Sequence, residues 1–403
     1  MYKANTKHLQ PLLISNINEL PEKHKALLEK SWASTFYTEL FCRIKEDAFK
    51  VLYADMPSRP NEPINRMIGF ETLKVGFGWT DEETYSHYVF DLQVRYALGL
   101  QDLHEGDFDL RTLYNFRARL SRYNSEHGVN LMDKAFEDIT DQQITTLKIK
   151  TGKQRMDSTQ IASNIREMSR LQLLVEVLQR VYRMLAEEDQ QKYSEQFADY
   201  LQGHAGQYVY RIKGQDTGGH IDKIGKLMQR LLEELKPNYE QEPVYQVLKR
   251  VFAEHYRIEE KEVKTKEGKE LSASSLQSPD DLEATYREKG RKSYKGYVAN
   301  LTETCDPENE LQLITKVQVA SNTTEDADLL VEALPNLKQR MGLDTLYDDG
   351  GFGSPAADQA LQENSVVQIQ TAIRGRTPST EKLNLSDFEI KQTEKGVPAR
   401  ITC

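Results

Sequence analysis

Cysteine is scarce in this chain: only Cys42, Cys305 and Cys403 occur, and they lie far apart in the sequence. No Cys-x-x-Cys pair is present, and none of the eight histidines belongs to a His-x-x-x-His pattern. These absences argue against a disulfide framework and leave no zinc motif with the spacing that its ligands need. We therefore expect the histidines to lie on the surface or to be satisfied core residues.

Long apolar runs are also missing, since no stretch reaches the 18 residues that a membrane-spanning helix needs. The N-terminus lacks a signal-peptide layout, because Gln10 and Pro11 interrupt the short apolar patch that follows Lys7. We expect a cytoplasmic protein with no membrane partner. The net charge of −10 argues weakly against nucleic acid, but a DNA-binding protein needs only a basic face.

Helical periodicity marks the first part of the chain, residues 1–143. Apolar residues recur at three- and four-residue spacings across 24–53, which predicts a helix there. Thr80 and Glu83 stand three apart before an aromatic-rich stretch, as in a capping box. Asp109 is the expected N-cap of the next helix.

An arginine-rich segment follows this cap, with four arginines and no acidic residue between Arg111 and Arg122. Its expected buried stripe is Leu113, Phe116 and Leu120. The opposite face carries Arg111, Asn115, Arg119 and Arg122. Arginine and asparagine pair with guanine and adenine edges, and arginine also binds phosphate. This face is a candidate DNA reader of the helix-turn-helix kind, and a solvated face without specific function is the alternative.

Strand and helix patterns alternate from residue 144 on. Apolar and polar residues alternate over 145–157, on both sides of Gly152, which predicts a hairpin or two short strands that end at Asp157. A helical interruption follows, in which Pro237 is expected to end one helix and the polar segment 261–280 reads as a linker. Later patterns predict strands at 294–301, 313–319, 343–349 and 366–369 and helices at 326–341 and 355–361. The prediction is an α+β or α/β fold, with a mixed sheet flanked by helices.

Two acidic positions end strands of this expected sheet: Asp157, and the pair Asp348 and Asp349 before Gly350 and Gly351. Carboxylates on neighbouring strands can share Mg²⁺ ions, which prefer oxygen ligands. Two such ions about 3.5–4 Å apart can activate a water and stabilise the leaving oxygen of a phosphodiester. A helix cap at Asp157 and a plain turn at Asp349 are the alternatives, and the glycines match no nucleotide-binding pattern.

These segments resemble the DDE transposases of bacterial insertion sequences, which have an RNase H-like catalytic domain. Residues 154–161 (Gln-Arg-Met-Asp-Ser-Thr-Gln-Ile) are similar to the family's first-aspartate block, and 294–297 (Tyr-Lys-Gly-Tyr) to its second-strand block. Residues 346–354 (Leu-Tyr-Asp-Asp-Gly-Gly-Phe-Gly-Ser) are similar to the second-aspartate block, whose form selects Asp349 rather than Asp348. Residues 109–120 resemble the family's N-terminal helical domain.

The resemblance implies a helical, helix-turn-helix-like DNA-binding domain at 1–143 and an RNase H-like catalytic domain at 144–376, with a helical insertion at about 167–275. It also implies that Asp157 and Asp349 ligate two Mg²⁺ or Mn²⁺ ions, so that water cuts one DNA strand and the freed 3′-hydroxyl attacks target DNA. The implied partners are double-stranded terminal inverted repeats, target DNA and a second copy in a homodimer. Bound to DNA, the protein would be associated with the nucleoid.

One departure from the family concerns its third acid, a glutamate on a helix after the last strands. The polar tail 377–403 holds Glu389 and Glu394, but neither has a helical context. We therefore expect a truncated chain that cleaves DNA weakly or not at all by itself. The alternatives are a non-catalytic DNA-binding remnant and, less favoured, a helical assembly protein.

Two basic runs fit a nucleic-acid track. The first holds Arg287, Lys289, Arg291, Lys292 and Lys295, and the second holds Arg374 and Arg376. Phosphate contacts by such residues would make DNA binding fall steeply with salt. Arg291 and Lys292 are the candidates of the first run, and a solvated charged loop is the alternative.

Overall fold

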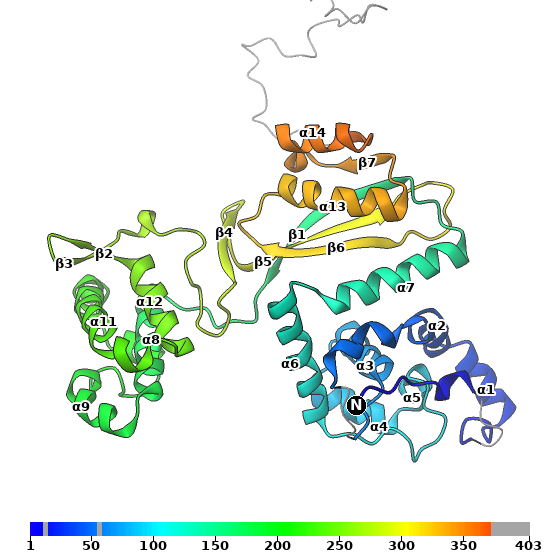
Figure 1. Ribbon diagram of the computed structural model, residues 1–403, viewed down its shortest axis with the longest axis horizontal. Helices are drawn as coiled ribbons and strands as arrows, with labels where there is room; N and C mark the ends of the chain where they lie inside the picture. The colour runs from blue at the N-terminus through cyan, green and yellow to red at the C-terminus, as the bar shows by residue number, and fades with distance from the viewer. Residues whose placement is uncertain (11–14, 55–58, 372–403) are drawn as a thin grey trace, which may run out of the picture. The chain divides into compact units, whose positions relative to one another are not determined.

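The computed structural model describes residues 1–10, 15–54 and 59–371 (Figure 1). The expected basic pair Arg374 and Arg376 and the expected tail 377–403 lie outside the described residues. The chain divides into two compact units. The first comprises 1–154, 302–317 and 336–343, and the second comprises 155–301, 318–335 and the described residues from 344 on.

Helices dominate the first unit. They are α1 (Glu22–Glu29), α2 (Trp32–Glu39), α3 (Ile64–Phe77), α4 (Asp81–Phe90), α5 (Leu92–Ala97), α6 (Leu110–His127) and α7 (Leu131–Leu147). Their core is rich in buried aromatic rings, among them Phe41, Phe49, Phe70, Tyr88 and Phe116. Burial of such large rings supplies much of the hydrophobic stabilisation of this unit.

Local capping explains where several of these helices begin. The expected single helix over 24–53 is wrong, because Ser31 accepts a hydrogen bond from the backbone of Ala33 and starts a new helix, α2. The capping box of Thr80 and Glu83 is confirmed at α4. Asp109 is confirmed as the N-cap of α6, where it accepts from the backbone N–H of Arg111.

The expected hairpin over 145–157 is wrong. Helix α7 continues to Leu147, and β1 (Lys153–Ala162) begins six residues later. Thr145 and Thr146 lie in the last turn of α7, where their hydroxyls donate to the carbonyls of Asp141 and Gln142, and Lys148 ends the helix in the left-handed conformation. Asp157 therefore does not end a strand: it is the fifth of the ten residues of β1.

One six-stranded sheet lies within the described residues, and its strand order is β4-β5-β1-β7-β8, with β6 also paired to β5. The other strands are β4 (Thr285–Lys289), β5 (Lys292–Thr304), β6 (Ile314–Ser321), β7 (Thr345–Asp348) and β8 (Val367–Gln370). Strands β4 and β5 are antiparallel, whereas β7 and β8 are parallel. Helix α13 (Asp326–Met341) connects β6 to β7, and α14 (Pro355–Glu363) connects β7 to β8. The expected mixed sheet with helices is thereby confirmed.

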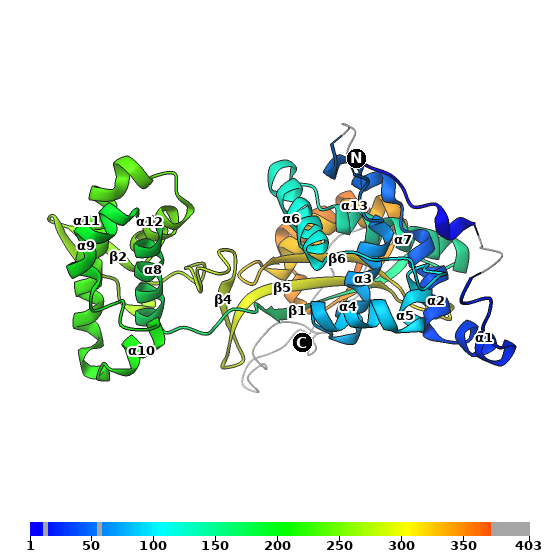
Figure 2. The same cartoon turned by 90° about the horizontal axis from the view of Figure 1, so that it is seen from below.

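The helical insertion in the second unit has its own hydrophobic core. It contains α8 (Arg170–Met184), α9 (Glu187–Phe197), α10 (Ala205–Tyr210), α11 (Thr217–Tyr239), α12 (Pro243–His255) and the hairpin β2 (Tyr256–Glu259) with β3 (Glu262–Thr265) (Figure 2). Pro237 does not end α11, which continues two residues further to Tyr239 although proline cannot donate a hydrogen bond to the carbonyl of Glu233. The expected linker 261–280 is also corrected, since β3 lies within it.

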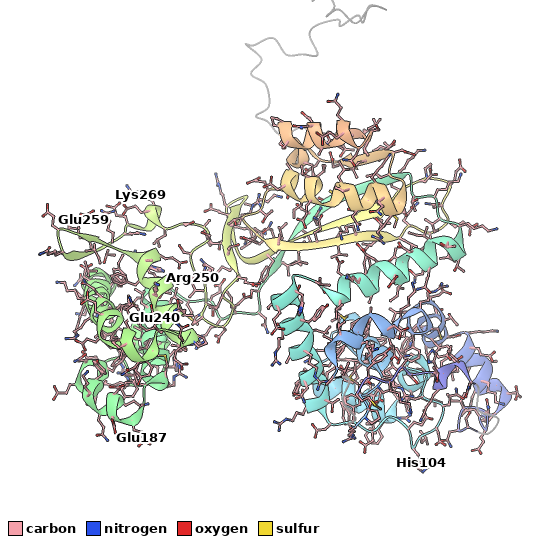
Figure 3. All side chains as sticks on the ribbon, in the orientation of Figure 1. His104, Glu187, Glu240, Arg250, Glu259 and Lys269 are labelled. Atoms are coloured by element: carbon pink, nitrogen blue, oxygen red, sulfur yellow. The ribbon has the colours of Figure 1, made fainter. Side chains whose placement is uncertain are left out.

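The side chain of Arg250 holds the loop that follows this hairpin through hydrogen bonds to its backbone. Arg250 on α12 donates to the backbone carbonyls of Leu282 and Ser274, at 2.6 and 3.1 Å (Figure 3). The same guanidinium pairs with Glu254 one turn further along α12.

Among the described residues no helix combines the length and low charge that crossing a membrane requires.

Candidate functional site

Two exposed aspartates stand on neighbouring strands of the sheet. Asp157 lies within β1, and Asp349 directly follows β7, the strand that pairs with β1. Both aspartates are exposed, whereas their chain neighbours Met156 and Asp348 are buried. Because side chains alternate between the faces of a strand, each aspartate points to the solvent-facing side of its strand. Neighbouring strands lie about 4.8 Å apart, a separation that lets two carboxylates approach a common cation.

Backbone amides orient both carboxylates. Asp157 Oδ1 accepts a 2.8 Å hydrogen bond from the N–H of Ser158. Asp349 Oδ1 accepts a 2.7 Å hydrogen bond from Gly351, at the start of a short 3-10 helix over Gly350–Phe352. The alternative of a helix cap at Asp157 is wrong because that residue lies inside a strand, but Asp349 does cap a turn. In both residues the second carboxylate oxygen has no hydrogen-bond partner in the described part of the chain.

Asp348 has a different environment from Asp349. It is buried, and its Oδ2 accepts a 2.8 Å hydrogen bond from the amide of Gln368 on β8. Its Oδ1 is buried with no partner among the described residues. Burial raises the pKa of Asp348 to about 6, a shift that the Gln368 hydrogen bond opposes and the charge of Asp349 increases. Of these two acids, only Asp349 meets solvent and can reach a metal ion there.

The donor set at the two exposed aspartates fits a hard divalent cation. Mg²⁺ prefers carboxylate oxygens and keeps several waters of its own. In the described ranges no group of three or more His, Cys, Asp or Glu side chains converges on one point. Two carboxylates would thus be the contribution of these residues, and water or phosphate oxygens would supply the remaining ligands.

The segment 294–297, which resembles the second-strand block, has a structural role in this chain. A Cβ at Gly296 would lie 2.3 Å from the carbonyl oxygen of Ile161 and 2.5 Å from the nitrogen of Ser163, so only glycine lets β5 approach the end of β1. Tyr297 donates a 2.6 Å hydrogen bond to Asp281. Ser163 also donates to Asp281, which ties the end of β1 to the loop before β4.

The predicted DNA-binding face lies on α6. Leu113 and Phe116 are buried and Leu120 is partly buried, which confirms the apolar stripe. The predicted contact residues Arg111, Asn115, Arg119 and Arg122 are all exposed. None of the four forms an ion pair with an acid in the described residues. Their charges and hydrogen-bonding groups are therefore accessible to a ligand.

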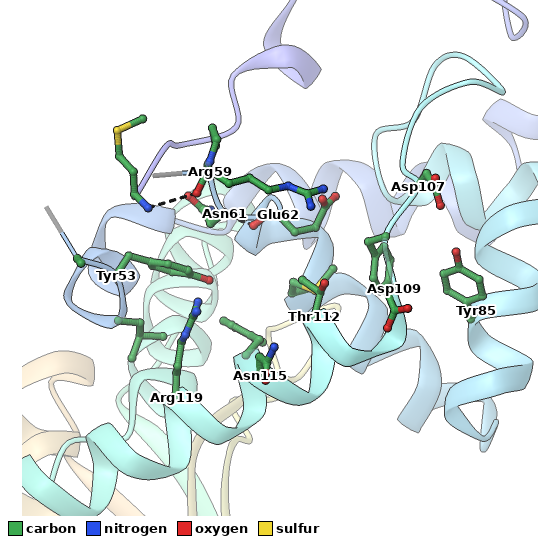
Figure 4. Close-up of a pocket in the computed structure, with 17 residues that line it drawn as sticks. Tyr53, Arg59, Asn61, Glu62, Tyr85, Asp107, Asp109, Thr112, Asn115 and Arg119 are labelled. Atoms are coloured by element: carbon green, nitrogen blue, oxygen red, sulfur yellow. Dashed lines mark hydrogen bonds between the residues drawn. The ribbon is translucent and has the colours of Figure 1, made fainter. Parts of the chain in front are cut away.

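Arg119 and Asn115 also line a pocket of about 720 Å³ in the first unit (Figure 4). The guanidinium of Arg119 lies 4.9 Å from the ring centre of Tyr53, a cation–π contact that fixes its position. The acidic residues Glu62, Asp107 and Asp109 line the same pocket. A phosphate at Arg119 would therefore meet nearby negative charge, whereas Arg111 and Arg122 lie outside this pocket.

The fourth arginine of α6, Arg117, has a structural role that the sequence pattern did not reveal. Its guanidinium donates to both carboxylate oxygens of Glu71 on α3 and to both of Asp81 on α4. The Arg117 hydrogen bond holds the pKa of Asp81 well below its usual range. Arg117 thus joins three helices of the first unit, and two carboxylates already neutralise the charge that it would offer to DNA.

The connection between α5 and α6 differs from that of the expected helix-turn-helix motif. Residues 98–109 separate α5 from α6, a connection longer than the three- or four-residue turn of that motif. A short turn with a left-handed glycine, Gly128, joins α6 to α7 instead. Acidic residues of α7 form ion pairs within the first unit: Glu137 pairs with Lys316, and Asp141 pairs with Arg340. Helix α6, and not α7, therefore offers the accessible basic face.

The first basic run forms the tip of the β4–β5 hairpin. Lys289 pairs with Lys292 in the register, and Gly290 and Arg291 form a two-residue turn with positive φ angles of 60° and 65°. Lys289, Arg291 and Lys292 are exposed there. Arg287 instead donates to backbone carbonyls of the second unit, and Lys295 to that of Met168. Three cations of the run remain accessible at the tip.

Comparison of the chain with models of known protein families, with curated proteins and with solved structures finds no match. The side chains and their geometry are thus the basis for a functional proposal. Three features stand out in that geometry: the exposed aspartates of β1 and β7, the basic face of α6 and the cationic tip of the β4–β5 hairpin.

Proposed function

We propose that this chain is a metal-dependent enzyme that cleaves and joins DNA strands, of the DDE transposase class. Asp157 and Asp349 would hold Mg²⁺ or Mn²⁺ through their solvent-facing oxygens. When bound, such ions supply Lewis-acid stabilisation of phosphate oxygens and activation of an attacking water or hydroxyl. The bound DNA would be the terminal repeats and target of an insertion sequence, paired by a homodimer.

One observation carries this proposal: two exposed carboxylates occupy neighbouring strands although about 190 residues separate them in the sequence. Carboxylates on neighbouring strands can share a divalent cation, and both of these carboxylates are exposed to solvent. In the RNase H-like fold, the first strand lies between antiparallel strands on one side and parallel strands on the other. The order β4-β5-β1-β7-β8 supports that fold.

The chain's own residues have defined tasks in this proposal. The backbone N–H groups of Ser158 and Gly351 hold one oxygen of each carboxylate and leave the other oxygen for a metal ion. The basic face of α6 and the tip of the β4–β5 hairpin would bind phosphates and hold the duplex in register. Binding would then precede cleavage and would not depend on the aspartates.

Manganese binding tests the site directly. Mn²⁺ titrations of the full chain, followed by the electron paramagnetic resonance signal of the free ion, would compare the wild type with Asp157→Asn and Asp349→Asn. Each substitution should weaken Mn²⁺ binding at least tenfold, because one of two charged ligands is lost. The matched control is Asp358→Asn, an exposed aspartate on α14 that should leave binding unchanged. Equal Mn²⁺ affinity in all four proteins would overturn the proposed metal site.

A second candidate function is DNA binding without cleavage. It is favoured by the accessible basic groups of α6 and the hairpin tip, which involve neither aspartate. Nicking of supercoiled plasmid in Mn²⁺ separates the two candidates. Nicking that disappears in Asp157→Asn and Asp349→Asn while DNA affinity persists supports the enzyme. Unchanged DNA affinity with no nicking by any protein supports the binding protein.

A further inference from the structure

An open pocket of about 600 Å³ lies in the helical insertion, away from the residues discussed so far. The side chains that line it are Arg166, Gln172, His204, Gln207, Tyr210 and Arg211. They come from the segment before α8, from α8 itself and from α10 with its flanking residues. None of these lining residues is acidic, so two arginines and a histidine share a hollow with no neutralising carboxylate.

The two arginines of this pocket lack acidic partners among the described residues. In the described part of the chain the Arg166 guanidinium has no ion-pair partner, and Arg211 donates only to the neutral side chain of Gln202. Two uncompensated guanidinium groups beside one hollow favour an anion with several oxygens, such as a phosphodiester.

Tyr210 adds a second kind of recognition. Its side chain is 93% exposed, the largest exposed fraction among the described large hydrophobic and aromatic residues. An aromatic ring left in water at the rim of a cationic pocket offers a flat surface on which an unpaired base can stack. The amides of Gln172 and Gln207 supply donors and acceptors that suit base edges of any sequence.

We propose that this pocket binds a single-stranded segment of DNA, with phosphates at Arg166 and Arg211 and an unpaired base on Tyr210. The inference rests on the proposed function, because strand cleavage frees a DNA end that can then unpair from its complement. A duplex would satisfy only the arginines, since paired bases are stacked on each other and have no free face for Tyr210. The insertion would thus hold the cut strand.

The test uses the full chain in EDTA, so that no metal-dependent step takes part. Fluorescence anisotropy of labelled oligothymidylate measures affinity at several salt concentrations, beside a matched duplex. Tyr210→Ala should weaken strand binding about tenfold, the loss of one stacked base. The double variant Arg166→Ala with Arg211→Ala should reduce the salt slope by roughly 1.4, or 0.7 for each lost phosphate contact. Arg183→Ala, an exposed arginine of α8, and Phe90→Ala, an exposed aromatic residue of the first unit, are the controls.

A cross-link locates the bound base independently of affinity. Oligothymidylate that carries 5-iododeoxyuridine should form a photo-cross-link to Tyr210, identified by mass spectrometry of the digested protein. Cross-links confined to other regions, a loss in Tyr210→Ala no larger than in Phe90→Ala, or equal losses for strand and duplex would each overturn the proposal. Asp157→Asn and Asp349→Asn should bind the strand normally in EDTA. A failed Mn²⁺ titration would therefore count against the aspartate site without altering this result.

Discussion

The carboxylate of Asp348 accepts a 2.8 Å hydrogen bond from the side-chain amide of Gln368, across the parallel pair β7 and β8. This contact satisfies one buried oxygen, while the other oxygen of Asp348 has no partner in the described residues. A buried carboxylate with one neutral hydrogen-bond donor is more stable when protonated. The exposed Asp349 beside it can therefore carry its negative charge without a second full charge next to it in mildly acidic solution.

Asp348→Asn should stabilise the protein at neutral pH. The pKa of Asp348 is raised from 3.8 to about 6 in the folded state, so the folded state retains a proton that the unfolded chain loses as the pH rises through this window. Stability is lost over that rise in the wild type but not in the variant. Urea unfolding at pH 7 should show a gain of up to about 3 kcal/mol, at 1.36 kcal/mol for each pKa unit. The gain should disappear below pH 4, and a less stable variant at pH 7 would contradict this view of Asp348.

Gly296→Ala should destabilise the sheet. The φ angle of Gly296 is 147°, and its missing Cβ would meet backbone atoms of Ile161 and Ser163 rather than a flexible side chain. Relief requires β5 and β1 to separate, at a cost of about 2–4 kcal/mol in the free energy of unfolding. Chemical denaturation followed by circular dichroism measures this loss. Gly76→Ala is the control, since no atom lies within 4 Å of a Cβ there, and it should cause no loss.

Alanine substitution of two arginines of α6 should have different effects: one should lower stability and the other should weaken DNA binding. Arg117→Ala removes the hydrogen bonds to Glu71 and Asp81 and should lower the stability of the first unit by about 2 kcal/mol. Arg122→Ala removes an exposed cation and should leave stability unchanged. If Arg122 binds a phosphate, its loss should reduce the salt slope of duplex binding by about 0.9. Thermal unfolding and anisotropy titrations of both variants provide the comparison, and an unchanged slope in Arg122→Ala would remove that residue from the DNA-binding face.

His255 should make the insertion sensitive to acid. Its imidazole is buried without a hydrogen-bond partner in the described residues, and burial, aided by the charges of Arg170 and Lys266, lowers its pKa from 6.5 to about 4. The unfolded chain therefore binds a proton between these pH values that the folded protein does not, and stability falls as the pH drops through 6.5 towards 4. The loss amounts to about 3 kcal/mol.

His255→Leu should remove this part of the acid sensitivity, because leucine cannot bind a proton. Urea unfolding at pH 7 and pH 4.5 should show a smaller difference in the variant than in the wild type. His24→Leu, at an exposed position, is the control and should leave the pH dependence unchanged. Identical acid sensitivity in His255→Leu and the wild type would show that His255 is not the group responsible.

Local patterns in the sequence were sufficient to predict the position of many helices and strands. The capping residues Thr80 and Asp109 predicted where α4 and α6 begin, because a cap is a contact between residues two or three apart. The alternating and helical periods predicted β6, α13 and β8 to within about a residue or two at each end. The same local reasoning failed at α7 and β1, where Thr145 and Thr146 continue the helix and the strand begins only at Lys153.

The sequence by itself supplied the candidates for a functional site: the acids at 157 and 349 and the basic face of α6. Only the tertiary structure decided that β1 and β7 are neighbours, that Asp348 is buried while Asp349 is exposed, and that Arg117 links α6 to α3 and α4. The pocket around Tyr210 likewise joins segments that no local pattern connects. The physical reason is that periodicity reports contacts within a few residues, whereas strand pairing, desolvation and charge pairing depend on segments that meet only in the folded chain.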